Sequence, residues 1–259
     1  MNDAQAVAVL GAGTMGQGIA QVAAVAGHPT TLFDASKERA EAARDAIAAQ
    51  LQRLVSKGKI TADAAVRSMD RLRTAAALEE ACGGARVVVE SVPEVLELKV
   101  SVLQRAAAAA EGALLASNTS ALSVTELGAK VGAAPRVLGL HFFNPAPVME
   151  LIEVVVGLGT SAAAVEEGLA FARGLGKQPI VVRDTPGFAT SRLGVLLGAE
   201  AIRMVESGVA SAEDIDRGLE LGYRHPMGPL KLTDLVVLDV RLAALEHLHG
   251  EAGEQFPPP

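Results

Sequence analysis

Apolar and polar positions form blocks of two kinds along the first 185 residues. Short runs rich in Val, Leu and Ala predict buried β-strands, and longer segments with helical spacing stand between them. The predicted strands are residues 7–10, 30–33, 72–74, 87–91, 114–117, 137–141, 151–156 and 179–183. The predicted helices between them include residues 15–26, 36–57, 96–109 and 162–175, with Ser36 and Thr61 as N-caps. This alternation is typical of βαβ units in a parallel sheet.

The alternation ends at Asp184-Thr185-Pro186-Gly187, where Pro and Gly interrupt both patterns. Only helical spacing follows, over residues 188–207, 211–221 and 230–249. We therefore expect a first domain over residues 1–185 and a second, all-helical domain over residues 186–259.

The first apolar run is followed directly by a glycine motif, Gly11-Ala12-Gly13-Thr14-Met15-Gly16. It fits G-x-G-x-x-G between a strand and a helix, the context in which this pattern binds a dinucleotide. Gly11 allows the tight turn, Gly13 lets the backbone approach a pyrophosphate, and Gly16 lets the helix pack closely on the strand. The free N–H groups of the helix N-terminus then face the phosphates. The motif and the alternation predict an α/β protein with a Rossmann-type N-terminal domain.

An acidic residue, Asp34, ends the second predicted strand. A carboxylate there can accept hydrogen bonds from both ribose hydroxyls of an adenosine, and it repels a 2′-phosphate. Asp34 therefore favours NAD over NADP as the cofactor. A glycine turn followed by a helix-capping Asp is the alternative interpretation of the same residues.

Composition and charge narrow the function classes. The chain has 23 basic and 30 acidic residues, a formal net charge of −7, which argues against nucleic acid as a partner. With 6 Phe, 1 Tyr and no Trp, the chain is also poorly supplied with side chains for stacking bases. The single Cys82 excludes an internal disulfide. No His stands at a metal-ligand spacing with a carboxylate partner, so we expect no metal.

Residues 4–33 carry no Lys, Arg, Asp or Glu, which is a reason to consider a membrane span. Five Gly residues interrupt this run and Pro29 follows, so we expect no membrane segment. The start Met-Asn-Asp lacks the basic region of a signal peptide. A cytoplasmic location is therefore expected.

A second set of polar residues stands at the ends of later predicted strands. Ser117-Asn118-Thr119-Ser120 closes one strand, His141 closes the next, and Glu153 lies on the strand after that. Residues at the carboxyl ends of parallel strands face the ligand crevice. A His beside a nicotinamide can take the proton from a substrate hydroxyl, and a carboxylate behind it fixes its tautomer. The alternative is a structural His at a strand end, with Glu153 in a surface ion pair.

Four strings of residues are similar to those of the L-3-hydroxyacyl-CoA dehydrogenase family. They are SNTS at 117–120, HFFNPAPVMELIE at 141–153, DTPGF at 184–188 and HPMGP at 225–229. The likeness covers about residues 7–250, and the bacterial 3-hydroxybutyryl-CoA branch resembles the chain most. The HFFNP string is specific, because the related gulonate dehydrogenase and lens-crystallin group differs there.

The resemblance implies a role for each residue of the second set. His141 is implied to remove the proton from the 3-hydroxyl, and Glu153 to orient and polarise His141. Ser120 is implied to bond near the substrate oxygen and the nicotinamide. Asn144 is implied to hold the ribose–nicotinamide end or the substrate carbonyl.

Charged residues elsewhere in the first domain also match the family. Glu94 and Lys99 match contacts to NAD, although from the residues alone both are interpreted as solvated charges. Arg53 and Lys57, with Lys59 nearby, form a basic cluster that matches positions where the family meets the coenzyme A nucleotide. A solvated helix end, with cations favoured by the helix dipole, is the alternative.

The chain departs from the family at two places. Ser191 stands where the family usually has an Asn near the substrate carbonyl, and its hydroxyl can donate one hydrogen bond there. The family also has a final helix and a lysine that approaches NAD beyond the position of Pro259, so a truncated form stays open. The resemblance further implies a homodimer formed by the helical domain.

These observations predict reversible, NAD-dependent oxidation of an (S)-3-hydroxyacyl-CoA. The expected substrate is 3-hydroxybutyryl-CoA, in fatty-acid or short-chain acyl-CoA metabolism. Two alternatives stay open. One is a catalytically impaired NAD-binding homologue with a structural or regulatory role. The other is a β-hydroxyacid dehydrogenase of the 6-phosphogluconate type, which would use a Lys base in a different motif.

Overall fold

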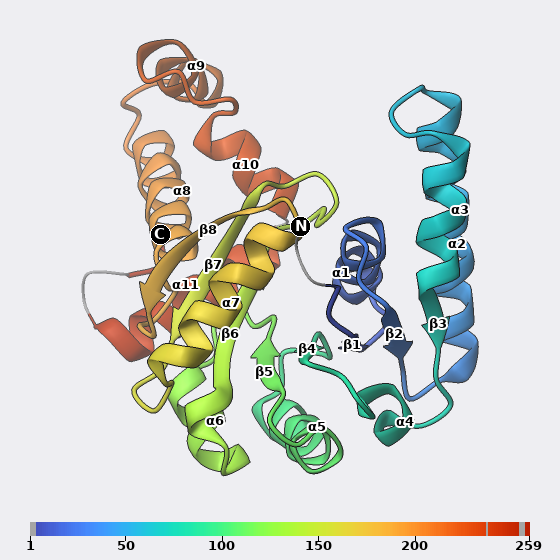
Figure 1. The fold of residues 1–259 in the computed structure, drawn as a ribbon. Helices are drawn as coiled ribbons and strands as arrows, with labels where there is room; N and C mark the ends of the chain where they lie inside the picture. Colours follow the sequence, from blue (N-terminus) through green and yellow to red (C-terminus); the bar gives the residue numbers. More distant parts are fainter. Residues whose placement is uncertain (1–3, 237, 254–256) are drawn as a thin grey trace. The chain divides into compact units, whose positions relative to one another are not determined.

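The chain divides into two compact units. A computed structural model describes residues 4–236, 238–253 and 257–259. The first unit extends to Asp184, and the second begins at Thr185. The first is a Rossmann-type α/β unit and the second is built from helices (Figure 1), so the predicted fold class is confirmed. Within the described ranges, every helix is too short or too polar to span a lipid bilayer.

The first unit is organised around one eight-stranded sheet of order β3-β2-β1-β4-β5-β6-β7-β8. The strands are β1 (Val7–Leu10), β2 (Thr30–Phe33), β3 (Leu72–Thr74), β4 (Val87–Glu90), β5 (Leu114–Ser117), β6 (Val137–Phe142), β7 (Leu151–Val156) and β8 (Gln178–Arg183). The expected parallel arrangement is found from β1 to β6, whereas β7 runs antiparallel to β6. The reason lies in the connection over residues 143–150, which is too short for the helical crossover that a parallel pair requires.

Helices cover the sheet. They are α1 (Thr14–Val25), α2 (Lys37–Ser56), α3 (Ala62–Arg71), α4 (Leu78–Cys82), α5 (Leu96–Ala109), α6 (Val124–Val131), the 3₁₀ turn η1 (Ala134–Arg136) and α7 (Ala162–Gly174). Helices α1, α2, α3, α5 and α7 follow the predicted pattern, whereas α4, α6 and η1 were not predicted. The caps Ser36 and Thr61 are confirmed, because their hydroxyls accept hydrogen bonds from Arg39 N and Ala64 N. Helices α4, α5 and α6 pack in a row below the strands in Figure 1, and α1 lies above them.

The central strands are buried because helices cover both faces of the sheet. Every residue of β1, β4 and β5 is buried, which explains why these strands are apolar almost throughout rather than alternating. Cys82 at the end of α4 is also fully buried, and burial raises the pKa of its thiol to about 11. A thiol in this environment is unreactive and packs as a small apolar side chain.

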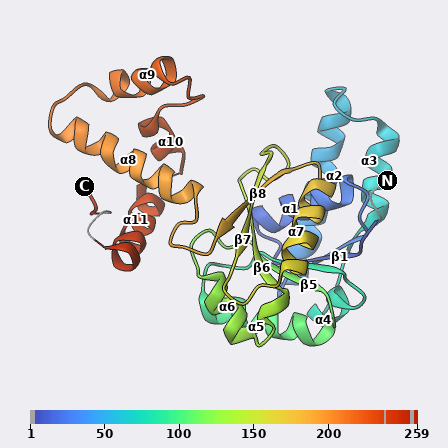
Figure 2. The ribbon, with the colours of Figure 1, turned by 60° about the vertical axis from the view of Figure 1, so that its left-hand side comes forward.

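The second unit contains four helices over its described residues (Figure 2), α8 (Thr190–Glu206), α9 (Ala212–Gly222), α10 (Pro229–Val236) and α11 (Leu238–Ala252). A small apolar cluster joins α8 to α11 and consists of Val195, Ala199, Leu245 and Leu248. Many other apolar side chains of this unit stay at the surface, including Leu193, Leu221 and Leu235.

Candidate active site

The glycine turn between β1 and α1 is built so that only its middle glycine faces open space. A Cβ atom on Gly11, which has a φ of 107°, would lie 2.5 Å from the Ser91 carbonyl oxygen. A Cβ atom on Gly16 would lie 1.8 Å from the Gly11 carbonyl oxygen. Around Gly13, by contrast, a Cβ atom would meet nothing within 4 Å. Gly13 is also the cap of α1 and has no side chain to bond the first N–H groups of the helix. This geometry fits a bound pyrophosphate.

Asp34 is fixed beside the glycine turn. Its Oδ2 accepts a hydrogen bond of 2.8 Å from Ala12 N, and its Oδ1 accepts one of 3.0 Å from Ser36 N. The guanidinium of Arg39 lies 3.7 Å from Oδ2. Asp34 therefore bonds the backbone locally, but it is not the helix cap of the alternative interpretation, because Ser36 is the N-cap of α2. Asp34 also lines the cleft described next.

A cleft of about 600 Å³ opens at the carboxyl ends of the strands within the first unit. Among the predicted cofactor residues, the following line it: Gly11, Gly13, Thr14, Met15, Asp34, Glu94 and Ser120. Four other predicted cofactor residues are not among its lining residues, namely Ala12, Gly16, Lys99 and Asn144. The cleft thus joins the glycine turn to the loops that follow β4 and β5.

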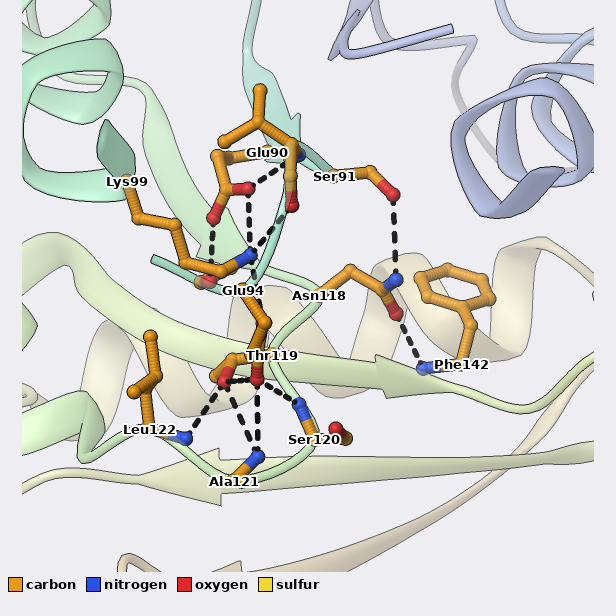
Figure 3. A network of polar contacts seen from close by, with 12 residues as sticks. Glu90, Ser91, Glu94, Lys99, Asn118, Thr119, Ser120, Ala121, Leu122 and Phe142 are labelled. Atoms are coloured by element: carbon orange, nitrogen blue, oxygen red, sulfur yellow. Dashed lines mark hydrogen bonds and ion pairs between the residues drawn. The ribbon is translucent and has the colours of Figure 1, made fainter. Parts of the chain in front are cut away.

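Lys99 is buried beneath this cleft and holds two carboxylates (Figure 3). Its Nζ lies 2.8 Å from Glu90 Oε1 and 3.1 Å from Glu94 Oε2, and it donates to the Val92 carbonyl oxygen at 3.1 Å. Only 1% of the Lys99 side chain is exposed, so the interpretation of Lys99 as a solvated charge is wrong. The signal that could have found this network is Glu90, a lone acidic residue in the otherwise apolar strand β4.

Glu94 orders the loop after β5. Its Oε1 accepts hydrogen bonds from the Thr119 hydroxyl, from Ser120 N at 2.9 Å and from Ala121 N at 3.2 Å. Burial opposes ionisation of Glu94, but the charge of Lys99 and these donors outweigh burial and lower the pKa of the carboxyl. Glu94 is therefore an anion that fixes Ser120 at the wall of the cleft.

His141 and Glu153 form a buried pair. They are directly opposite each other in the antiparallel ladder between β6 and β7, and His141 Nδ1 lies 2.7 Å from Glu153 Oε2. Glu153 is 0% exposed and His141 7% exposed, so Glu153 is not in a surface ion pair. The carboxylate assigns the proton to Nδ1, which makes Nε2 the nitrogen that can accept one. The ring of Phe143 lies against the imidazole, with ring centroids 4.5 Å apart.

Two positioning residues near this pair were missed by the sequence analysis. Asn118 Oδ1 accepts a hydrogen bond of 2.9 Å from Phe142 N, and its Nδ2 lies 3.4 Å from Ser91 Oγ (Figure 3). Lys177 Nζ donates to the carbonyl oxygens of Ala146 and Met149, both at 2.8 Å. Asn118 stands inside the quoted 117–120 string, whereas nothing in the sequence around Lys177 indicates its bonds to the loop after His141.

The remaining predicted residues lie elsewhere. Asn144 belongs to the loop after β6, and Arg53 and Lys57 are exposed at the C-terminal end of α2, outside the cleft. Ser191 lies in the first turn of α8, in the second unit. Across the described part of the chain, no group of three His, Cys, Asp or Glu residues is placed to hold a metal ion.

Comparison with known proteins identifies the family. Residues 6–185 match the model described as 3-hydroxyacyl-CoA dehydrogenase, NAD binding domain, and residues 187–259 match that of the C-terminal domain of the same family. The chain is 44% identical to a 3-hydroxyadipyl-CoA dehydrogenase of Escherichia coli, over 94% of this chain and 51% of that protein. It is 40% identical to a probable 3-hydroxybutyryl-CoA dehydrogenase of Bacillus subtilis, over 96% of this chain and 86% of that protein.

A solved structure has the same fold over nearly the whole chain. The (S)-3-hydroxybutyryl-CoA dehydrogenase of Ralstonia eutropha superposes with a TM-score of 0.95 at 37% identity, covering 99% of this chain and 91% of that one. The match to the NAD-binding domain of the family identifies NAD as the cofactor of the first unit, and the glycine turn and the cleft fit a dinucleotide. The chain therefore belongs to the 3-hydroxyacyl-CoA dehydrogenase family, with its NAD-binding domain followed by its C-terminal domain.

Proposed function

We propose that the protein catalyses the reversible, NAD-dependent oxidation of an (S)-3-hydroxyacyl-CoA to the 3-ketoacyl-CoA, with 3-hydroxybutyryl-CoA as its substrate. The observation that carries this proposal is the buried His141–Glu153 pair, 2.7 Å apart, in a chain with the NAD-binding domain of this family. The names of the relatives support a 3-hydroxyacyl-CoA as the substrate class. They differ in the acyl group, since one relative is named for 3-hydroxyadipyl-CoA and another for 3-hydroxybutyryl-CoA.

The proposed chemistry assigns proton transfer to His141. Nε2 accepts the proton of the 3-hydroxyl while the C3–H bond breaks and the carbonyl forms. NAD, when bound in the cleft, would supply the acceptor for the hydride, that is, for the hydrogen and its electron pair from C3. Glu153 then stabilises the imidazolium through Nδ1, so the proton is held until it passes to water. In the reverse direction the same imidazolium returns the proton to the carbonyl oxygen.

The cofactor would be held along the cleft of the first unit. The N–H groups at the start of α1, exposed next to Gly13, fit the pyrophosphate, and Asp34 fits the adenosine ribose. Ser120 and Asn144 would bond the nicotinamide end. Glu94 would face that end from the cleft wall.

The coenzyme A ester is assigned to residues outside the cleft. Arg53 and Lys57 are exposed cations on one helix, which suits the phosphates of the nucleotide. Ser191 would donate a hydrogen bond to the substrate in place of the family's usual Asn.

Turnover of acetoacetyl-CoA with NADH tests the function directly. Oxidation of NADH that depends on acetoacetyl-CoA is the expected result. NADH binding without turnover would favour the impaired homologue, and turnover of a free β-hydroxyacid but not of a CoA ester would favour the other dehydrogenase class. A scan of 3-ketoacyl-CoA substrates of increasing chain length then defines the acyl group.

We also propose a homodimer formed by the helical unit, located in the cytoplasm and serving fatty-acid or short-chain acyl-CoA metabolism. The exposed apolar side chains of the second unit support a self-complementary contact. The need for NAD and for coenzyme A esters, which cells keep inside, supports the location.

A further inference from the structure

The network beneath the cleft carries more negative than positive charge. Glu90 and Glu94 both pair with the single ammonium of Lys99, at 2.8 Å and 3.1 Å. Glu90 is 0% exposed and Lys99 1% exposed, whereas Glu94 is 36% exposed and lines the cleft. Two carboxylates and one ammonium leave this set, which we call the acidic triad, with one uncompensated negative charge.

The contacts of Glu90 keep its carboxylate charged. Oε1 takes the bond from Lys99 and one of 2.7 Å from Val92 N, and Oε2 accepts one of 2.6 Å from the Ser117 hydroxyl. Burial raises the pKa of Glu90, but Lys99 and the other donors oppose the rise. Because Lys99 Nζ and Val92 N can only donate, Oε1 carries no proton, and the buried ammonium of Lys99, 2.8 Å away, stabilises the carboxylate form of Glu90 against the effect of burial.

The strand order places the triad at the nicotinamide half of the cleft. Asp34 directly follows β2 on one side of the glycine turn of β1, and Glu90 is the last residue of β4 on the other side. A dinucleotide with its adenosine ribose at Asp34 and its pyrophosphate at the turn extends its nicotinamide over β4 and β5. Glu94 and Ser120 line the cleft there.

Other charged residues at the cleft are compensated. Arg39 lies 3.7 Å from Asp34, and Arg105 pairs with Glu79 at 2.9 Å. Since these pairs are neutral as units, the excess charge in the cleft wall comes from the triad.

The two redox forms of the cofactor differ by one charge at the nicotinamide ring, which is cationic in NAD⁺ and neutral in NADH. We propose that the negative charge of the acidic triad stabilises bound NAD⁺ more than bound NADH. The triad would thereby shift the equilibrium between the oxidised and reduced forms of the bound cofactor toward NAD⁺. Glu90 supplies the excess charge without touching the cleft and acts as a positioning residue through Lys99 and Glu94. This inference rests on the proposed function, because it assumes that the cleft holds NAD.

The test compares the dissociation constants of NAD⁺ and NADH in wild type and in Glu90→Gln. Quenching of NADH fluorescence gives one constant, and displacement of NADH by NAD⁺ gives the other. The substitution is nearly isosteric and removes one negative charge. We expect the ratio of the NAD⁺ constant to the NADH constant to rise by about three- to tenfold, as a buried charge near the ring implies. If Glu90 had a purely structural role, the substitution would weaken the binding of NAD⁺ and of NADH equally and leave the ratio of their dissociation constants unchanged.

Two further variants make the result decisive. Glu97→Gln removes an exposed charge from the same helix, α5, and should leave the ratio at the wild-type value. Glu94→Gln retains an oxygen that can accept the hydrogen bond from Ser120 N, and it should raise the ratio, as Glu90→Gln does. If Glu90→Gln does not fold, Glu94→Gln alone decides, and an unchanged ratio there overturns the inference.

Wild-type measurements separate this inference from the proposed function. An unchanged ratio in the variants, with normal wild-type turnover of acetoacetyl-CoA, contradicts only the role of the triad. Absence of NADH binding by wild type contradicts both.

Discussion

His141 owes its chemical character to one neighbour, the carboxylate of Glu153. Replacing His141 by Gln keeps a side chain of similar size and removes the imidazole that we propose as the proton acceptor. We expect kcat for acetoacetyl-CoA reduction to fall by about 10²- to 10⁴-fold, the usual contribution of a positioned general base. Fluorescence titration should show NADH binding close to that of wild type.

One control and one further variant accompany this prediction. His249→Gln, at an exposed position of α11, should leave kcat unchanged. Glu153→Gln should lower kcat and alter the pH–rate profile, since the imidazolium loses its stabilising charge. A His141→Gln enzyme with near-normal kcat would falsify the assignment of the base.

Asp34 governs a second prediction, the choice between NADH and NADPH. The carboxylate is held in place by Ala12 N and Ser36 N and would face the 2′-phosphate of NADPH. We expect kcat/KM with NADH to exceed that with NADPH by at least about tenfold. Asp34→Ala should narrow the gap, because it removes the repulsion and releases Arg39 for the phosphate. Equal kcat/KM values in wild type would mean that Asp34 does not face the ribose.

Among the elements, the loop over residues 143–150 combines hydrogen bonds of its own with contacts to neighbouring elements. Lys177 binds two of its carbonyl oxygens, and a Cβ atom on Gly18 of α1 would approach the Ala146 side chain to 3.1 Å. The substitution Lys177→Met removes both hydrogen bonds and leaves the carbonyl groups unpaired by that side chain. Denaturant titration should show the free energy of unfolding reduced by about 1–3 kcal/mol.

Two comparisons isolate the contribution of the hydrogen bonds at Lys177. Lys177→Arg retains donors and should recover part of the lost stability, whereas Lys59→Met removes an exposed cation and should have little effect. A Lys177→Met protein as stable as wild type would show that the loop is held by packing alone.

Elements with local signals could be predicted from the sequence, and elements that depend on distant partners could not. Ser36 and Thr61 predict the starts of α2 and α3, because an N-cap bonds backbone groups within the first turn of its own helix. Helix α6 has only eight residues, too few helical turns for its apolar spacing to be distinguished from the surrounding loop. The antiparallel direction of β7 depends on its pairing with β6, which the sequence does not show. For that reason the distance of twelve residues between His141 and Glu153 could not decide whether their side chains meet. The burial of Lys99 likewise depends on Glu90, nine residues away.

At the scale of the whole molecule, the helical unit has a small buried cluster and leaves several large apolar side chains exposed. Leu193 is 61% exposed on α8 and Leu235 is 69% exposed on α10. A small domain with so little core gains stability by association. We expect light scattering at tens of micromolar to give about twice the chain mass of 26.5 kDa.

A matched pair of variants localises that association. Leu193→Glu should shift the protein toward monomer, whereas Leu158→Glu, at a 94% exposed position of the first unit, should leave the mass unchanged. A wild-type protein that stays monomeric at that concentration would contradict the proposed homodimer.

The contact between His141 and Glu153 also depends on the register of the ladder between β6 and β7. Side chains alternate between the two faces of a strand, so a register slip of one residue would turn Glu153 away from His141. The same slip would bring Ile152 and Val154, both now 0% exposed in the core, onto the opposite face and send a carboxylate into their place. A misregistered chain would thus lose core stability together with the His141–Glu153 contact, so a folded form that lacks this contact should not accumulate.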